Sequence, residues 1–369
     1  MNKQNNICFF NTTPFWGGGE KLHLEYALEF KKLNYNVCVV AKKDSPFFQE
    51  SKEEGIKVYP LTVKTFSFLN RKKVLEARNF FRKNKINTVF ISASPDLKIA
   101  AFAAKKAGVK NIIYLRGLAV SIKNTPLNRV LLTKTVTHII ANSEETKRQM
   151  VKNFRDPVLE KKVKVIYHGI DLSLFDKKFY ETSPLNVKKE GVFVIGNAGR
   201  LTKQKGQYFL IEIAKNLRAK NLNFKILIAG AGEEEETIKQ LIAVNNLQDY
   251  VILLGFVKNI EGFMKSLDVF ALTSIWEGFG YVIVEAMAAK KPVVAFDITS
   301  NPEIITQNKT GFLIPQKNVE QFSEKIDLLL NDTNLARKMG ADGRKKVEER
   351  FQLKTIILEI EMYLKLKNK

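Results

Sequence analysis

Short apolar runs alternate with amphipathic segments along most of this chain, and the alternation occurs twice. Runs such as Val37–Ala41 precede segments with helical spacing such as Arg71–Asn84, and the pattern begins again with Val192–Ile195. Strands that are apolar throughout are buried on both faces, and strands separated by helices form parallel sheets. The pattern therefore predicts an α/β fold with two doubly wound, Rossmann-like domains.

The predicted elements also suggest where the domains end. The strands are expected at Ile7–Asn11, Val37–Ala41, Val58–Leu61, Thr88–Ser92, Asn111–Leu115, Val192–Ile195, Phe224–Ile228, Val251–Leu254, Val269–Leu272, Val293–Phe296 and Gly311–Ile314. A charged, weakly patterned stretch at 172–190 predicts a linker between an N-terminal domain (1–171) and a C-terminal domain (191–350). Helical spacing returns in the terminal segment 351–369.

Length and composition agree with this organisation. The chain has 369 residues, of which 45% are hydrophobic, enough for two domains of roughly 150–200 residues each. Its two cysteines, Cys8 and Cys38, lie in apolar runs and are predicted to be buried free thiols. We expect a cytoplasmic protein, because Met1–Asn6 is polar and no window holds about 18 consecutive apolar residues.

The net charge of +22 is concentrated in the first half. Residues 1–170 hold 31 Lys and Arg against 13 Asp and Glu, whereas residues 171–369 hold 29 against 25. A basic domain attracts anionic surfaces. Two basic stretches with apolar stripes, Arg71–Lys83 and Ser121–Thr137, predict peripheral docking on the inner face of the cytoplasmic membrane. Nucleic-acid binding is the alternative, but most phenylalanines fall in predicted core positions, so no nucleic-acid partner is expected.

Candidate chemistry is concentrated in the turn Glu277–Gly280. This turn follows the apolar run Val269–Leu272 and precedes a predicted helix, Val282–Ala289. Backbone amides at a helix N-terminus attract anions, and glycines allow a ligand to approach them closely. Glu285 lies about one turn inside the helix. The arrangement suits a ligand in which a phosphate group is linked to polyhydroxylated groups.

Glu277 and Glu285 form an E-x7-E pair, and the stretch resembles the signature of the retaining glycosyltransferases of family 4. The segment Gly199-Arg200-Leu201, with Lys205-Gly206 after it, resembles the family's G-R-L-x-x-x-K-G motif. Gly17-Gly18-Gly19-Glu20 resembles its N-terminal G-G-x-E loop. The resemblance implies the GT-B fold, in which two Rossmann-like domains face each other across a cleft and a C-terminal helix crosses back to the first domain.

The resemblance also implies roles for individual residues. Arg200 and Lys205 would hold the diphosphate of a nucleotide sugar, Glu277 would contact the transferred sugar, and Glu285 would contact the ribose. Catalysis is assigned to Glu277, Arg200 and Lys205. The expected donor-binding residues are Gly17, Gly18, Gly19, Arg116, Gly199, Arg200, Lys205, Phe256, Val257, Glu277, Gly278, Phe279, Gly280 and Glu285. Many relatives carry a histidine where this chain has Tyr114–Leu118, so Arg116 is expected to bind a phosphate or an anionic acceptor instead.

The implied activity is retaining transfer of a hexose-type sugar from a UDP- or GDP-sugar to a saccharide or lipid-linked acceptor, in cell-surface polysaccharide or glycolipid synthesis. No cofactor and no metal are expected, because the three histidines are scattered and no Asp-x-Asp pair occurs. A different nucleotide-sugar enzyme of this fold, such as an epimerase, is the alternative within the class. Gly230-Ala231-Gly232 is interpreted either as a second nucleotide loop or as a plain strand–helix turn.

Overall fold

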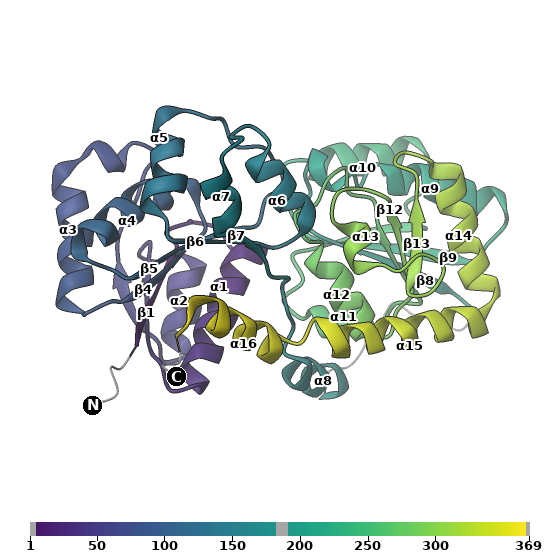
Figure 1. The fold of residues 1–369 in the computed structure, drawn as a ribbon. Helices are drawn as coiled ribbons and strands as arrows, with labels where there is room; N and C mark the ends of the chain where they lie inside the picture. The colour runs from purple at the N-terminus through teal and green to yellow at the C-terminus, as the bar shows by residue number, and fades with distance from the viewer. Residues whose placement is uncertain (1–4, 182–190, 367–369) are drawn as a thin grey trace. The chain divides into compact units, whose positions relative to one another are not determined.

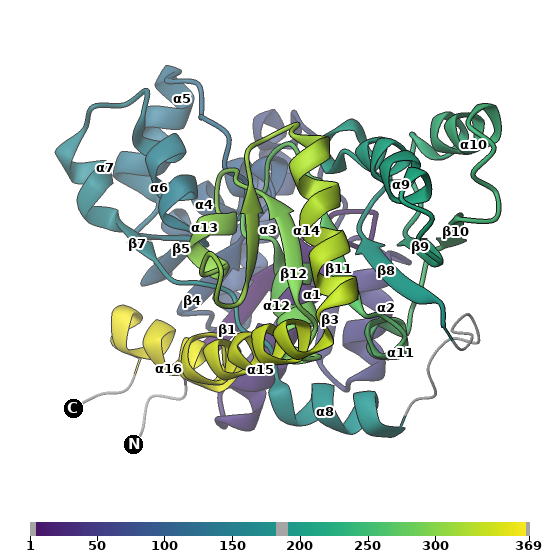
Figure 2. The same cartoon turned by 90° about the vertical axis from the view of Figure 1, so that its right-hand side faces the viewer.

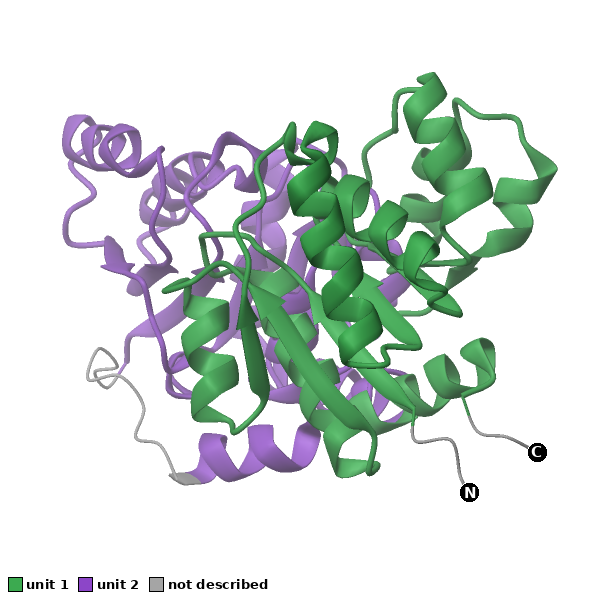
Figure 3. Ribbon diagram, turned by 90° about the vertical axis from the view of Figure 1, so that its left-hand side faces the viewer, with its two compact units in different colours: residues 1–168, 353–369 green, residues 169–352 purple. Residues whose placement is uncertain are grey.

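A computed structural model describes residues 5–181 and 191–366, and the chain divides into two compact units (Figure 3). Unit 1 comprises Met1–His168 and Leu353–Lys369, and unit 2 comprises Gly169–Gln352. The first boundary lies three residues before the end of the predicted N-terminal domain. The C-terminal segment that begins at Leu353 belongs to unit 1.

Unit 1 is built on one parallel sheet of seven strands in the order β3-β2-β1-β4-β5-β6-β7. Figure 1 labels β1, β4, β5, β6 and β7 of this sheet. The strands are β1 (Asn6–Phe10), β2 (Asn36–Ala41), β3 (Lys57–Pro60), β4 (Thr88–Ile91), β5 (Asn111–Arg116), β6 (His138–Ala141) and β7 (Val163–Val165). Residues such as Phe9 and Val89 are fully buried, as expected for strands covered on both faces.

Helices cover both faces of this sheet. They are α1 (Gly18–Lys32), α2 (Pro46–Glu53), η1 (Ser67–Leu69), α3 (Arg71–Lys83), α4 (Ser94–Ala107), α5 (Pro126–Arg129), η2 (Val130–Thr135), α6 (Glu144–Val151), α7 (Pro157–Lys162) and α16 (Leu353–Leu364). One apolar core contains residues of α3, α4 and η2, and a second contains residues of α1, α2 and α16. Tyr35 donates to Glu361 at 2.5 Å and so ties the C-terminal helix to the rest of unit 1.

Unit 2 repeats the plan with six parallel strands in the order β10-β9-β8-β11-β12-β13. The strands are β8 (Phe193–Ala198), β9 (Phe224–Ala229), β10 (Val251–Gly255), β11 (Val269–Leu272), β12 (Val293–Phe296) and β13 (Gly311–Ile314). The helices are α8 (Leu172–Glu181), η3 (Lys203–Lys205), α9 (Phe209–Ala219), α10 (Glu235–Val244), α11 (Ile260–Lys265), α12 (Tyr281–Ala288), α13 (Asn301–Ile304), α14 (Val319–Asn331) and α15 (Thr333–Arg350). Figure 2 shows α14 against β11 and β12. The prediction of two doubly wound parallel domains is confirmed.

The stretch predicted as a linker contains a helix. Residues 172–181 form α8, which packs on α11 of unit 2. The guanidinium of Arg344 on α15 holds Asp176 with two hydrogen bonds of 2.6 and 2.7 Å. Such a paired contact fixes orientation as well as distance, so α8 is an integral part of unit 2. The remainder of the predicted linker, 182–190, lies outside the described residues.

The structure overturns the predicted membrane-facing stripes of unit 1. In α3, Ala77 and Phe81 are buried in the core and Val74 packs against it. In the second stretch, Leu131 and Leu132 are buried in the same core and Leu127 packs against it, whereas Val130 stays 40% exposed. The stripes contact α4 and the sheet because an amphipathic helix in this fold buries its apolar face on the neighbouring layer. Peripheral membrane docking stays a prediction that rests on net charge.

Cys8 and Cys38 are buried free thiols on neighbouring strands, as predicted. Burial raises the pKa of Cys8 well above its ordinary value, and contact with Cys38 raises it further. Among the described residues, no helix is both long enough and apolar enough to cross a bilayer.

Two histidines are buried inside unit 1. His23 lies edge-on to Phe9 and Phe47, and both ring nitrogens lack a hydrogen-bond partner among the described residues. His168 lies 3.3 Å from the amide of Asn142 and edge-on to Tyr26. Burial lowers the pKa of each histidine from 6.5 to about 3, and the nearby His168 also lowers that of His23. These positions agree with a structural role for His168.

Acid should therefore destabilise unit 1. Below about pH 6.5 the unfolded chain binds protons at both histidines, whereas the folded chain binds them only near pH 3, so stability falls as pH falls. Asp96 acts in the opposite direction, since burial raises its pKa from 3.8 to about 6. Together, the three groups should lower the free energy of unfolding by roughly 2 kcal/mol between pH 7 and pH 5. Urea unfolding at both pH values measures it. His23→Phe should flatten the slope, and an unchanged slope in this variant would contradict the explanation.

Candidate functional site

The strand order of unit 2 reverses between β8 and β11, which lie side by side although they are distant in sequence. Loops that follow the two strands diverge there, and ligands of open parallel sheets bind at this kind of position, outside the carboxyl ends of the strands. The loop after β8 carries Arg200 and Lys205, and the loop after β11 carries Glu277. The topology thus brings two predicted motifs, separated by more than seventy residues, to one place.

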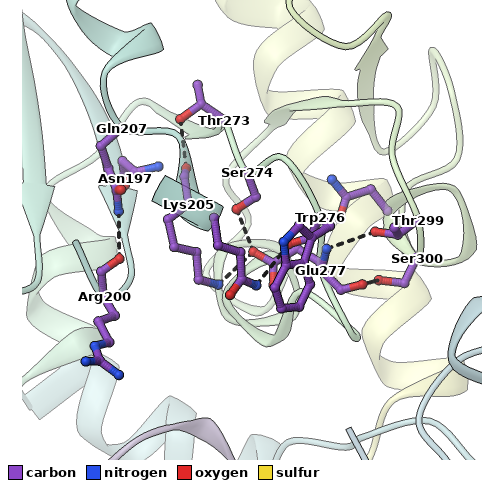
Figure 4. A network of polar contacts seen from close by, with 12 residues as sticks. Asn197, Arg200, Lys205, Gln207, Thr273, Ser274, Trp276, Glu277, Thr299 and Ser300 are labelled. Atoms are coloured by element: carbon purple, nitrogen blue, oxygen red, sulfur yellow. Dashed lines mark hydrogen bonds and ion pairs between the residues drawn. The ribbon is translucent and has the colours of Figure 1, made fainter. Parts of the chain in front are cut away.

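Lys205 and Glu277 form an ion pair at this position (Figure 4). Lys205 Nζ lies 2.7 Å from Glu277 Oε1, and Ser274 Oγ donates to the same oxygen at 2.6 Å. The side chains are only 20% and 7% exposed, so the pair is shielded from water on most sides. No hydrogen bond from any described residue reaches Oε2 of Glu277. One carboxylate oxygen is therefore anchored, and the other can accept a hydrogen bond from a ligand.

Backbone contacts join the two loops that carry this pair. The amide of Ile275 donates to the carbonyl of Gln204 at 2.7 Å, and the Gln204 side chain donates to the carbonyl of Trp276 at 3.0 Å. The amide of Glu277 itself donates to Thr299 Oγ1 at 2.9 Å (Figure 4). Each loop therefore holds the other in place, and the spacing of Lys205 and Glu277 does not depend on flexible side chains alone.

Arg200 has a different environment. Its side chain is 67% exposed, it lies 3.5 Å from Glu233, and its guanidinium points away from Lys205 and Glu277 (Figure 4). An exposed pair of this kind holds its partner weakly. Arg200 can therefore exchange Glu233 for an anionic ligand at little cost.

Gly230 and Gly232 support the loop that carries Arg200. A Cβ atom on Gly230 would lie 1.9 Å from the carbonyl oxygen of Gly199, and one on Gly232 would lie 2.2 Å from that of Leu201. Only glycine permits this approach of two backbones. Of the two interpretations of residues 230–232, the structure favours a tight turn that backs the Arg200 loop.

The second carboxylate lies on α12, which begins after Gly280. Gly280 caps the helix in the left-handed conformation (φ +60), which favours glycine. Glu285 is buried within this helix, about one turn from its start. The turn is also attached to the first and last segments of unit 2: Tyr281 donates to the carbonyl of Gly169 at 3.3 Å, and Phe279 packs edge-on against Phe351.

The remaining predicted residues of unit 2 lie at the same edge of the sheet. Phe256 follows β10 and is a large exposed aromatic side chain, while the adjacent Val257 is half-buried. The amide of Gly230 donates to the carbonyl of Gly255 at 2.7 Å and so links this loop to the Gly230 turn. Gly199 follows β8 directly.

Predicted residues of unit 1 lie at the corresponding edge of the first sheet. Gly17, Gly18 and Gly19 are exposed at the start of α1, with Gly17 at the N-cap position. Arg116 ends β5, where it donates to the carbonyl of Val120 at 2.6 Å and to the hydroxyl of Tyr114 at 3.2 Å. Arg116 thereby shapes the loop after β5. Its binding of a phosphate stays a prediction, as do the donor contacts of the three glycines.

Sequence reasoning missed the residues that orient the pair: Ser274, Gln204 and Thr299. Ser274 and Gln204 are within three residues of Glu277 and Lys205 respectively, so their position in the chain was a usable signal. Thr299 follows β12, and only the order of strands in the sheet brings it to Glu277.

Comparison with known proteins shows the family of this chain. A family model described as "Glycosyltransferase Family 4" matches residues 16–174, and one described as "Glycosyl transferases group 1" matches residues 180–346. The chain belongs to this family of glycosyltransferases, and its two units are the two Rossmann-like domains of the GT-B fold.

Relatives of this chain include an enzyme of capsular polysaccharide biosynthesis and a galactosyltransferase. It is 29% identical to the capsular polysaccharide biosynthesis glycosyltransferase CapM of Staphylococcus aureus, over 90% of this chain and 91% of that one. It is 25% identical to the UDP-Gal:alpha-D-GlcNAc-diphosphoundecaprenol alpha-1,3-galactosyltransferase of Escherichia coli, over 94% and 93%. The crystal structure of Anabaena Alr3699/HepE in complex with UDP and glucose shares the fold, with a TM-score of 0.84 and 23% identity over 97% of this chain and 99% of that one.

Proposed function

We propose that this glycosyltransferase moves a hexose-type sugar from a UDP- or GDP-sugar to a saccharide or lipid-linked acceptor, with retention of configuration and without a divalent metal. The product would enter cell-surface polysaccharide or glycolipid synthesis. The observation that carries the proposal is the shielded Lys205–Glu277 pair at the switch point of unit 2. It combines a cation for a phosphate with a carboxylate for a sugar, 2.7 Å apart.

Each part of the donor has a matching group in unit 2. Lys205, Arg200 and the N-terminus of α12 supply positive charge for the diphosphate. Phe256 offers an exposed aromatic face on which a base can stack. Glu285 is assigned to the ribose and Glu277, through its available Oε2, to the transferred sugar.

In the proposed reaction the anomeric C–O bond of the donor breaks, and its electron pair passes to the leaving phosphate oxygen. The acceptor hydroxyl attacks the anomeric carbon from the face that the phosphate leaves, and its proton passes to that phosphate. Positive charge develops on the sugar ring and negative charge on the diphosphate. Glu277 and Lys205 are placed to stabilise the two charges, and groups fixed before the reaction do so most effectively.

Relatives support the choice of donor and pathway. One relative acts in capsular polysaccharide biosynthesis, and the galactosyltransferase transfers galactose from UDP-Gal to alpha-D-GlcNAc-diphosphoundecaprenol. Anabaena Alr3699/HepE binds UDP. Family membership favours transfer over epimerisation and over nucleic-acid binding.

A screen of nucleotide sugars for thermal stabilisation tests the donor assignment. A ligand of the folded state at a hundredfold excess over its Kd stabilises by about 2.7 kcal/mol. We expect one UDP- or GDP-sugar to raise the Tm, both with and without EDTA. In a transfer reaction with that donor, NMR should show that the sugar in the product has the same anomeric configuration as in the donor. A requirement for metal, or an inverted product, would contradict the corresponding part of the proposal.

A further inference from the structure

Asp96 is a buried carboxylate of unit 1 that holds a segment other than its own. It lies in the first turn of α4 and is 1% exposed. Its Oδ2 accepts the backbone amide of Thr12 at 2.7 Å, and its Oδ1 accepts the Thr12 hydroxyl at 2.6 Å. An acidic residue in a first turn commonly stabilises the N-terminus of its own helix, but here Thr12 engages both oxygens. Asp96 therefore tethers the segment that follows β1 to α4.

This tether crosses the point at which the strand order of unit 1 reverses. Strands β1 and β4 lie side by side there, Thr12 follows β1, and Asp96 follows β4. In unit 2 the pair of Lys205 and Glu277 has the corresponding position, because these residues follow the adjacent strands β8 and β11. In each unit, a carboxylate that follows the fourth strand thus holds the segment that follows the first strand. Ligands of open parallel sheets bind at such switch points.

The loop that Asp96 holds is also closed at its base. It comprises residues 11–19 and ends in the three glycines at the start of α1. The side chain of Asn11 donates to Glu20, in the first turn of α1, at 3.0 Å. Trp16, directly before the glycines, packs against the second core of unit 1. Because the loop is anchored at both ends, a shift of Thr12 would displace the glycines as well.

We propose that Asp96 is a positioning residue of the transfer reaction, which holds the glycine loop of unit 1 in place for the donor diphosphate. Gly18 and Gly19 are exposed in the first turn of α1, where amides have no partner in their own helix and attract anions. Asp96 acts through Thr12 and touches no reacting atom. The inference rests on the proposed function. Because negative charge grows on the diphosphate in the transition state, a displaced loop should lower mainly kcat.

Asp96→Ala should lower kcat by about 10- to 30-fold and raise the donor KM less than about threefold. Asp96→Asn should stay within about threefold of the unsubstituted enzyme, because its amide can accept from the Thr12 amide and donate to the Thr12 hydroxyl oxygen. Burial raises the pKa of Asp96 to about 6, so assays at about pH 8 keep it ionised. Steady-state kinetics with the donor found by the thermal screen measures both constants.

Trp16 gives a second readout, which does not depend on activity. The chain has two tryptophans, so Trp276→Phe leaves Trp16 as the single one. In this background Asp96→Ala should raise the acrylamide quenching constant of Trp16 about twofold, since a loop released from its tether opens locally. Asp156→Ala is the matched control, because Asp156 also accepts two hydrogen bonds in unit 1, from amides at the start of α7. It should lower the Tm and change neither kcat nor the quenching.

A lowered Tm in Asp96→Ala with unchanged kcat and unchanged Trp16 quenching would show that Asp96 only stabilises the fold, and would overturn the inference. Equal losses of kcat in Asp96→Ala and Asp156→Ala would overturn it too, because general destabilisation would explain both. If Glu277→Gln lowers kcat and Asp96→Ala does not, the inference fails while the proposed function stands. If no UDP- or GDP-sugar is a donor, the proposed function itself fails, and the positioning role fails with it.

Discussion

Glu277→Gln should lower kcat by about 100- to 1,000-fold and change the donor KM little, the effect of removing one preorganised charge from a transition state. The glutamine amide oxygen can still accept from Ser274 and Lys205, which hold Oε1 at 2.6 and 2.7 Å, so the loop should keep its position. What is lost is the negative charge that opposes the positive charge on the sugar ring. Steady-state kinetics with the donor found by the thermal screen measures it, and circular dichroism verifies the fold.

Glu285→Gln provides the contrast. The proposed ribose contact exists in both the ground state and the transition state, so this variant should mainly raise donor KM. Both carboxylates are buried in the same motif, which makes the pair a matched comparison. If Glu277→Gln raised KM and left kcat unchanged, the assignment of Glu277 to the reacting sugar would be wrong.

Lys205→Ala should weaken UDP binding by about 10- to 150-fold, the range for a charge-assisted hydrogen bond of roughly 1.5–3 kcal/mol. Lys205 is directed into the site by its own turn, η3, and by the contacts of Gln204. Lys203→Ala is the control, because Lys203 lies in the same turn but is exposed. It should change the affinity less than twofold. Titration calorimetry with UDP decides the matter, and equal losses in the two variants would remove the phosphate assignment of Lys205.

The alanine variant has a second effect that must be separated from binding. Without Lys205, the carboxylate of Glu277 is largely buried without its counter-charge, which destabilises a fold. The double variant Lys205→Ala, Glu277→Gln should recover the lost Tm, because no buried charge remains, but not the affinity for UDP. Recovery of both would show that the loss in the single variant came from the fold.

Much of the fold follows from local pattern. Strands β11, β12 and β13 have the predicted bounds, and most other predicted elements differ by one to three residues at an end. Their apolar runs are short, bounded by polar residues and buried on both faces, so the pattern and the length of each run both predict a strand. Strands β6 and β7 and helices α6, α7, α13, α14 and α15 were not predicted. Strand β7 has three residues, too few to show a period, and α15 is too polar for a clear apolar stripe.

Other errors came from what a helix packs against. The stripes of α3 and of residues 121–137 have the composition of membrane-facing surfaces, but periodicity does not say which apolar layer covers a stripe. Here the layer is the core of unit 1. Phe66 and Leu69 are among the apolar residues of unit 1 that remain exposed, and they lie at the short helix η1, which is too brief to show a period. Their exposure is a property that only the folded chain defines.

The sequence by itself determined the fold class, the two-domain organisation and the motif residues, because these depend on local periodicity, on glycine at special turns and on short spacings. Tertiary structure alone decided that Lys205 and Glu277 form a pair with Ser274, that Arg200 points away from it, and that α8 belongs to unit 2. The physical reason is that a parallel sheet aligns the ends of strands that are distant in sequence. Which side chains meet there depends on strand order and burial, and neither is encoded in any single segment.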